Sequence, residues 1–236
     1  MRKTTNLAWI AASLLLSGAS GARAQEAGGV FLDVNIGIQA PSQTLQTNSQ
    51  FQLYGETASV LSTQTVGLAP VLEGRLGYRV SERFGVAVAV SGTRETADAQ
   101  GVASVPSPIL FGSPTITTLT ASGLDRREIG YHFQIVWFLR KAGGLELSLY
   151  GGPSVIHLRQ DVPTATASGQ NLSVGSATET ANAFGGNGGV DGTYMMSPSF
   201  GLGFFARYAG GSADIPSATG VRVGGVQGGG GLRIRF

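Results

Sequence analysis

The two histidines, His132 and His157, are the side chains best suited to acid–base chemistry near neutral pH. On a strand, the residue two positions after each histidine lies on the same face as that histidine. Those positions hold Gln134 and Arg159, and neither is a nucleophile. Glu128 shares the face of His132 and would lie close enough to hydrogen-bond near it. We therefore interpret His132 as a polar interior residue and His157 as a rim residue, and we expect neither to be catalytic.

Metal and cofactor sites are not indicated elsewhere in the sequence. The chain has no cysteine, and two histidines alone do not make a zinc site. The glycine-rich segment 185–191 differs from a calcium-binding nonapeptide because it occurs once and its aspartate is displaced. Segment 224–231 lacks the Lys-Ser/Thr of a phosphate-binding loop. We expect no cofactor and no metal, and we expect no nucleic-acid partner because no basic patch carries interleaved aromatic residues.

Charged residues recur instead at alternate positions of apolar segments, as in a strand with one polar face. In segment 128–139 every odd-numbered residue is apolar, whereas Glu128, His132 and Gln134 occupy even-numbered positions. Across the chain, five acids and five bases fall on the polar face: Asp33, Glu73, Glu128, Glu146 and Asp191, with Arg75, Arg79, Arg207, Arg233 and Arg235. The near balance predicts that these charges pair with one another, since an unpaired charge in a partly dry interior is strongly unfavourable.

Eight segments show this alternation, at residues 30–39, 72–80, 84–91, 128–139, 145–159, 184–194, 200–208 and 226–236. The connections alternate in length. Short turns are expected at 81–83, 140–144 and 197–199, and long connections at about 40–68, 95–124, 160–180 and 210–220. Short and long connections therefore fall at opposite ends of an antiparallel arrangement. Segments 40–68 and 95–124 are interpreted as solvated loops without a fixed partner, or, from their short local alternation, as strands that project above the membrane and could recruit a partner strand or a surface ligand.

This pattern predicts an all-β fold, an eight-stranded antiparallel up-and-down transmembrane β-barrel. Tilted strands of about ten residues cross a bilayer, and in such barrels the apolar residues face outward and the polar ones inward. A water-soluble barrel would show the opposite pattern. Hydrocarbon offers no partner for backbone groups, so the sheet must close. Aromatic residues expected at the lipid interface are Tyr78, Tyr131, Trp137, Tyr194 and Tyr208.

Residues 1–24 have the features of a secretory signal peptide, with residues 25–236 as the barrel domain. Arg2 and Lys3 precede an apolar stretch, and Ala22-Arg23-Ala24 is a small-x-small cleavage site, so cleavage is expected after Ala24. Removing the leader leaves 16 − 3 = 13 basic residues against 14 acidic ones, a net charge of −1. The basic isoelectric point therefore belongs to the leader, and the mature protein is expected beyond the inner membrane.

The sequence resembles the small eight-stranded outer-membrane barrels of Gram-negative bacteria, of the OmpA/OmpX and opacity-protein type, over about residues 29–236. Its last strand is similar to the C-terminal assembly signal of that group, through Gly231, Ile234 and the terminal Phe236; Gly229 stands where a polar residue is usual. The resemblance implies a location in the bacterial outer membrane, contact with its lipid and lipopolysaccharide, and recognition by periplasmic chaperones and the barrel-assembly machinery. Lipid A deacylases share the fold, but their histidine–serine spacing is broken here at Gln134 and Arg159.

Three functions follow from these expectations. The interior of an eight-stranded barrel is just wide enough for side chains or one small ligand, which argues against a general porin. The first hypothesis is a non-enzymatic barrel that supports envelope integrity and presents its loops outside, with its lumen plugged by paired charges. The second is a narrow or gated channel for small polar solutes. The third is an enzyme acting on lipid A, and the sequence names no extracellular ligand for the loops.

Overall fold

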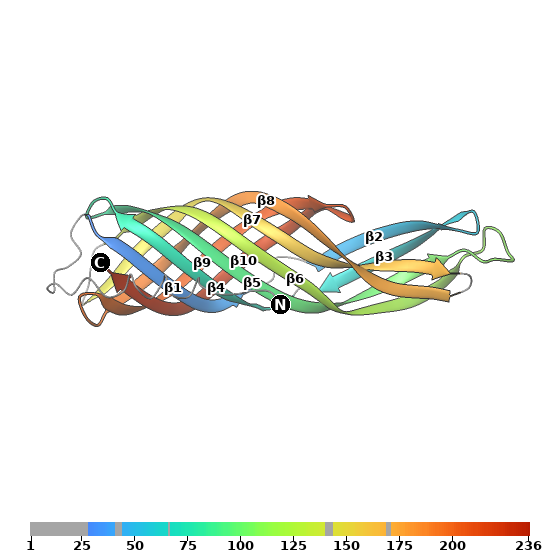
Figure 1. Ribbon diagram of the computed structural model, residues 1–236, viewed down its shortest axis with the longest axis horizontal. Coiled ribbons are helices and arrows are strands. Elements are labelled where there is room, and N and C mark those ends of the chain that lie inside the picture. Colours follow the sequence, from blue (N-terminus) through green and yellow to red (C-terminus); the bar gives the residue numbers. More distant parts are fainter. Residues whose placement is uncertain (1–27, 41–43, 66, 140–143, 169–170) are drawn as a thin grey trace, which may run out of the picture.

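The computed structural model describes residues 28–40, 44–65, 67–139, 144–168 and 171–236. The predicted leader and its cleavage site lie outside these residues. The described chain forms ten strands (Figure 1): β1 (Val30–Gln39), β2 (Thr44–Leu53), β3 (Glu56–Thr65), β4 (Ala69–Arg79), β5 (Phe84–Val105), β6 (Thr115–Phe138), β7 (Leu145–Ser168), β8 (Asn171–Met195), β9 (Phe200–Ile215) and β10 (Ala218–Arg235). Within this part of the chain, no helix is long and apolar enough to cross a membrane.

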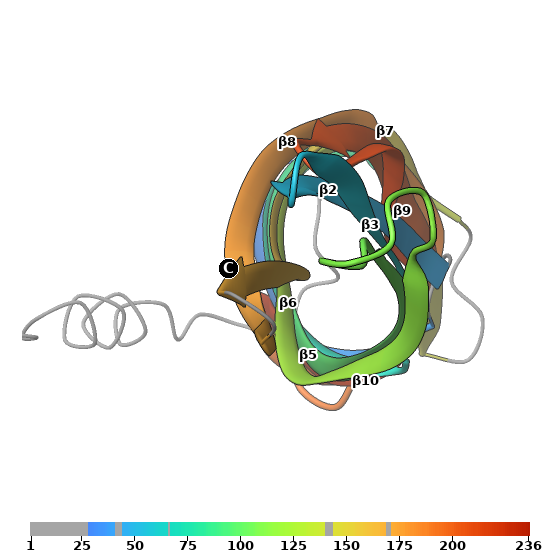
Figure 2. The same ribbon diagram turned by 90° about the vertical axis from the view of Figure 1, so that its right-hand side faces the viewer.

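Eight of these strands close into a barrel. The hydrogen-bonded order runs β1, β4, β5, β6, β7, β8, β9 and β10, and β10 pairs again with β1. All of these neighbours are antiparallel, and Figure 2 shows the resulting ring seen along the barrel. The predicted eight-stranded antiparallel barrel is therefore confirmed.

The backbones of the first and last strands, β1 and β10, approach each other closely at the seam between them. In its register Val34 lies opposite Leu232, and Asn35 lies opposite Gly231. A Cβ atom added at Gly231 would overlap the Val34 carbonyl oxygen, so only glycine leaves the two strands free to hydrogen-bond at this point. The glycine of the terminal sequence pattern thus has a packing role in closing the ring.

The strands continue well beyond the segments predicted from alternation. Segments 95–124, 160–180 and 210–220 were expected as loops, but most of their residues extend the strands β5 to β10. Segment 40–68 contains the hairpin β2–β3, and β3 pairs with the upper part of β5 from Ser59↔Ser104 to Gln64↔Ala99. The loop expectation was wrong because it used apolar-outward alternation as the sign of a strand, and these extensions carry polar residues on their outer face.

The two ends of the barrel differ as predicted. Short turns at 81–83 and 197–199 lie at the end that carries the C-terminus, and the long hairpins lie at the other end (Figure 1). Serine side chains cap both turns, since Ser81 Oγ accepts from Phe84 N at 3.1 Å and Ser197 Oγ accepts from Phe200 N at 3.0 Å. Of the turn predicted at 140–144, residues 140–143 lie outside the described chain.

Outward-facing residues form an apolar belt around the lower part of the barrel, by which we mean the part nearer the short turns; the long hairpins are at its upper end. We define this belt by the outward positions from Phe84 to Val90 on β5, from Ile129 to Trp137 on β6 and from Phe200 to Tyr208 on β9. On β6, the five outward residues are 43–66% exposed although all are apolar. The stretches on β6 and β9 span nine residues each and match the roughly 9–11 residues that a tilted strand needs to cross hydrocarbon, whereas the stretch on β5 spans seven.

Candidate functional site: a polar network in the lumen

The residues predicted to form the lumen charge network all lie on the inner face of the barrel. Strand alternation turns each of them inward, and each is buried: Asp33, Glu73, Arg75, Glu128, His132, Glu146, Asp191, Arg207, Arg233 and Arg235. Eight of the ten belong to one connected set of hydrogen bonds and ion pairs. Among the contacts of the described residues, Glu146 pairs with Arg79 and His132 contacts two serines.

Asp33 on β1 is the centre of the lower part of this network. Its Oδ2 atom accepts from Arg75 Nε at 2.8 Å and from Arg75 Nη2 at 2.6 Å, across the β1–β4 pair. Its Oδ1 atom accepts from Arg235 Nη1 at 2.7 Å, across the β1–β10 seam. The carboxylate is fully buried, and a buried charge is tolerated only with such partners.

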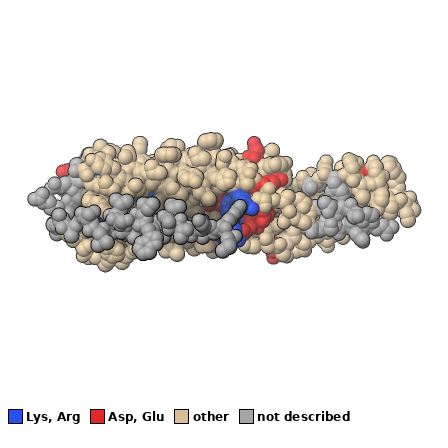
Figure 3. All heavy atoms as spheres, viewed as in Figure 1, with Lys and Arg blue, Asp and Glu red and all other residues tan. Residues whose placement is uncertain are grey.

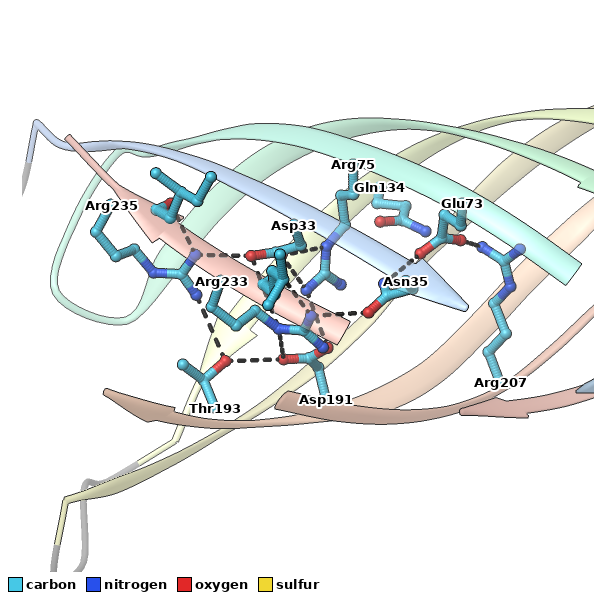
Figure 4. A network of polar contacts seen from close by, with 12 residues as sticks. Asp33, Asn35, Glu73, Arg75, Gln134, Asp191, Thr193, Arg207, Arg233 and Arg235 are labelled. Carbon is cyan, nitrogen blue, oxygen red and sulfur yellow. Dashed lines mark hydrogen bonds and ion pairs between the residues drawn. The ribbon is translucent and has the colours of Figure 1, made fainter. Parts of the chain in front are cut away.

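Asp191 on β8 extends the network across the barrel (Figure 4). Arg233 donates to Asp191 from Nη2 at 2.6 Å, and Arg75 Nη2 lies 3.2 Å from the same carboxylate. Thr193 donates its hydroxyl to Asp191 at 3.0 Å. A Cβ atom at Gly203 would overlap the Arg233 guanidinium, so a residue without a side chain makes room for this arginine.

A second branch runs upward along the barrel. Arg233 donates to Asn35 Oδ1 at 2.7 Å, and Asn35 donates to Glu73 Oε1 at 2.9 Å. Glu73 also pairs with Arg207, which donates from Nε to Gln227 Oε1 at 2.6 Å. The Asn35 amide of β1 therefore joins Arg233 of β10 to Glu73 of β4.

The branch continues from Gln227 to the upper end of the lumen. Gln227 donates to Gln39, whose Nε2 donates to Glu128 Oε2 at 3.0 Å. Glu128 is held by Arg126 at 2.7 Å, and Arg126 donates to Gln160 at 3.0 Å. The network thus follows the barrel axis from Arg235 to Gln160 without a break.

Arg79 and Glu146 form a separate ion pair near the short-turn end, with Nη1 and Oε2 3.1 Å apart. The Arg79 guanidinium lies over the Phe138 ring, 4.0 Å from its centroid. Phe138 in turn meets Phe31 edge to face at 5.9 Å between centroids, and Tyr150 completes this buried cluster with Ala87 and Val136. Aromatic rings therefore pack among the charges at this end of the lumen, since Arg235 also lies over the Phe31 ring, 5.2 Å from its centroid.

Comparison with known structures supports the architecture. The chain matches the crystal structure of the outer membrane protein OprG from Pseudomonas aeruginosa with a TM-score of 0.57 at 12% identity, covering 90% of this chain and 97% of that one. This chain has the fold of the small outer-membrane β-barrels. Neisserial surface protein A gives a TM-score of 0.42 at 15% identity over 90% of this chain and 100% of that one. The Escherichia coli outer membrane protease OmpT gives 0.48 at 9% over 88% and 97%. The barrel matches no protein-family profile and no curated protein sequence.

His132 of the barrel lies in a group of neutral polar side chains. Its Nε2 atom is 2.9 Å from Ser91 Oγ, and its Nδ1 atom is 2.8 Å from Ser154 Oγ. Asn187 donates to Ser154 at 2.9 Å and accepts from Gln134 at 3.0 Å. The imidazole is only 1% exposed, so both of its nitrogens are committed to buried hydroxyls and neither is open to a substrate. Among the described residues, no group of three or more His, Asp or Glu is placed to hold a metal ion.

Above the belt the inner and outer faces exchange character. On β8, Thr178, Thr180 and Asn182 are exposed, whereas Ala183 is fully buried. The upper lumen contains a cluster of eight buried apolar residues: Ile156, Leu158, Val162, Ala183, Ala213, Ile215, Val221 and Val223. A sheet surrounded by water buries its apolar face, so the exchange marks the height at which hydrocarbon gives way to water. The expectation of a polar inner face holds below this height. Above it, buried apolar residues share the interior with polar side chains such as Arg126, Gln160 and Gln64.

Several members of the network were not predicted from the sequence. Arg126 lies two residues before Glu128 on the same face, so the alternation already placed it inside. Gln39 and Gln227 occupy inward positions of segments 30–39 and 226–236, so the alternation placed them inside too, whereas Gln160 lies in a segment that was expected to be a loop. Their roles come from the register that brings three distant segments together.

Proposed function

We propose that this protein is a non-enzymatic integral barrel of the bacterial outer membrane that supports the envelope and presents its hairpins outside. The apolar belt supports the membrane location, because its outward residues would be unfavourable in water and its height suits hydrocarbon. The exchange of inner and outer character above the belt supports the orientation, with the long hairpins on the aqueous outer side. The fold shared with OprG is consistent with both.

The observation that carries the closed-lumen part of the proposal is the unbroken polar network. Its members come from strands on every side of the barrel and are buried, with Arg233 and Asp33 both 0% exposed. Moving a solute along the axis would require breaking charge-assisted hydrogen bonds, which are among the stronger ones in proteins. We infer that the lumen is plugged by these pairs at rest.

Two features argue for a structural role of the histidines. His132 faces the lumen and contacts serines, so lipid does not reach it. His157 faces outward and contacts Asn182 Oδ1 at 2.8 Å. Neither shares its position with a nucleophile and a carboxylate in the arrangement that hydrolysis of an acyl ester uses.

Planar-bilayer recording on the refolded protein tests the closed lumen. We expect no stable unitary current in the wild-type protein. A reproducible single-channel conductance would contradict the plug and favour the alternative of a narrow channel for small polar solutes. Expression of the protein followed by analysis of lipid A acyl chains tests the enzyme alternative, and we expect the acyl pattern to be unchanged.

Biogenesis is the second part of the proposal. Ile234 and Phe236 face outward on the last strand, and Gly231 lies in the seam that closes the ring. We infer that this strand is the signal read by the barrel-assembly machinery after delivery by periplasmic chaperones. Replacing Phe236 with Ser should lower the amount of protein in outer-membrane fractions, and an unchanged amount would contradict this role.

A further inference from the structure

Three arginines lie side by side on the outer face of the barrel at the upper limit of the apolar belt. Arg94 of β5 lies opposite Arg127 of β6, and Arg127 lies opposite Arg159 of β7. All three are exposed, so they form a row of positive charge across three neighbouring strands. We call these residues the arginine row.

Like charges in direct cross-strand register repel one another, so the row needs negative charge nearby. Asp125 supplies part of it, since its carboxylate accepts from Arg94 Nη2 at 2.9 Å and from Arg127 Nη2 at 3.1 Å. The hydrogen bonds from Arg94 in particular lower the pKa of Asp125 below its usual value. Within the described part of the chain, Arg159 has no ion pair or hydrogen bond to its side chain, so the row is only partly neutralised.

The acids near the row lie on the side away from the belt. Asp125 lies one residue above Arg126 on β6, and its backbone N–H donates to Asp161 of β7 at 3.2 Å. On the belt side, the neighbouring outward residues are Ile129 and His157, which face each other across the same strand pair. The guanidinium groups therefore stand between a carboxylate layer facing water and an apolar surface facing hydrocarbon. Figure 3 shows charged side chains gathered at this middle height of the visible face, between the two ends.

We propose that the arginine row is a binding site for the phosphate group of a membrane lipid headgroup. This rests on the proposed outer-membrane location, because only there does a lipid surround the belt. Headgroup phosphates lie directly above the hydrocarbon, which is the height of the row. Arginine is suited to them because its planar guanidinium donates two parallel hydrogen bonds to phosphate oxygens.

The hydrogen-bond donors of the row that Asp125 leaves free determine which ligand the row would bind. Arg159 offers a full set of donors, whereas Arg94 and Arg127 share one carboxylate between them. A phosphate seated between Arg127 and Arg159 would meet donors from two strands while its acyl chains run down the belt beside Ile129. A free phosphate ion would meet the same donors without the apolar contact, so it should bind more weakly.

Titration calorimetry on the refolded protein in dodecyl maltoside micelles tests this site. The probes are dihexanoyl phosphatidic acid, dihexanoylglycerol with the same chains and no phosphate, and inorganic phosphate. We expect saturable binding of phosphatidic acid that weakens as sodium chloride is raised. We expect at least tenfold weaker binding of the two other probes.

Variants locate the binding on the row. The triple substitution R94Q/R127Q/R159Q should weaken phosphatidic acid binding at least tenfold, and Arg159→Gln alone should weaken it several-fold. Arg222→Gln is the matched control, because Arg222 is an exposed arginine on β10 away from the row, and its affinity should equal that of the wild-type protein. Unchanged affinity in the triple variant would overturn the site.

Two further outcomes would overturn the proposal in other ways. Equal binding of inorganic phosphate would make the row a free-anion site, and equal binding of dihexanoylglycerol would make it an apolar surface only. Each preparation is first checked on an unheated gel, where a folded barrel migrates differently from the boiled protein. A wild-type protein that never shows this shift would contradict the barrel itself, whereas a folded barrel without lipid binding would contradict the arginine row alone.

Discussion

Asp33 and Arg235 lie on the first and last strands of the barrel, and their Oδ1 and Nη1 atoms are 2.7 Å apart across the seam. Three arginines in all converge on this one carboxylate, since Arg75 and Arg233 approach it from the neighbouring strands. The contact that pairs these charges in the lumen therefore also links the two strands that close the ring.

Replacing Asp33 with Asn should destabilise the barrel strongly. The substitution leaves buried arginines without their shared counter-ion, and breaking such a pair typically costs about 3–5 kcal/mol. Urea titration of the refolded protein in lipid vesicles should show this as a lower free energy of unfolding. Glu82→Gln is the control, because Glu82 is exposed in a turn, and its effect should stay within about 0.5 kcal/mol.

Adding Arg235→Gln to Asp33→Asn gives a sharper form of that test. Removing both partners leaves fewer uncompensated charges than removing one, so the double variant should recover part of the lost stability. Strict additivity of the two single losses would show that the pair contributes nothing specific to the seam.

Arg207→Ala and Glu128→Ala should each open a leak through the lumen. Arg207 joins Glu73 to Gln227, and Glu128 joins Gln39 to Arg126, so either change breaks the axial network. Planar-bilayer recording should show a conductance that the wild-type protein lacks. Permeability equal to the wild type in both variants would count against the role of these pairs as a plug.

Gly231→Ala should impair closure of the ring, whereas Gly228→Ala should be tolerated. A methyl group at Gly231 would overlap the Val34 carbonyl oxygen, but at Gly228 its nearest neighbour would be the Phe205 carbonyl oxygen at 3.6 Å, an ordinary contact. The measurement is the fraction of refolded protein whose gel mobility shifts on boiling. Equal fractions for the two variants would show that the close approach of the seam strands is not limiting.

His132→Phe and His157→Phe form a matched pair that separates buried from exposed histidine. The first change leaves the hydroxyls of Ser91 and Ser154 without their imidazole partner, which costs about 1–3 kcal/mol for a buried polar group. The second removes only an exposed contact and should stay within about 0.5 kcal/mol. Urea midpoints of the two variants check this, and a larger loss for His157→Phe would contradict the assignment of His132 to the interior.

The membrane part of the fold was predictable from the sequence because hydrocarbon imposes one rule on every strand: the outward-facing residues must be apolar. Segment 128–139 and the last strand follow that rule without exception on their outer face, so their orientation and the inward placement of Glu128 and Arg233 could be predicted from alternation. The ring itself followed from the even number of strands and the need to pair every edge.

The rest could not be predicted because the rule changes with height. Above the arginine row the outer face meets water, and strands such as β8 carry threonine and asparagine outside and alanine inside, so outward apolar alternation no longer marks them. The contacts of Gln39 and Gln160 depend on the stagger between strands, which sets the residues that meet across the lumen. Alternation gives the face of a residue but not its height.

The pairing of β5 and β6, which extends to Val105↔Thr115 with one register shift between Ala97 and Ala99, also determines what the molecule displays. From Arg94 to Val105 the strand continues for about 36 Å measured along the strand, at roughly 3.3 Å per residue. The connecting turn therefore lies at the end of a hydrogen-bonded strand pair and not in an irregular loop. A foreign epitope inserted beside Gly112 would stand clear of the bilayer surface, and the wall below it would keep its geometry.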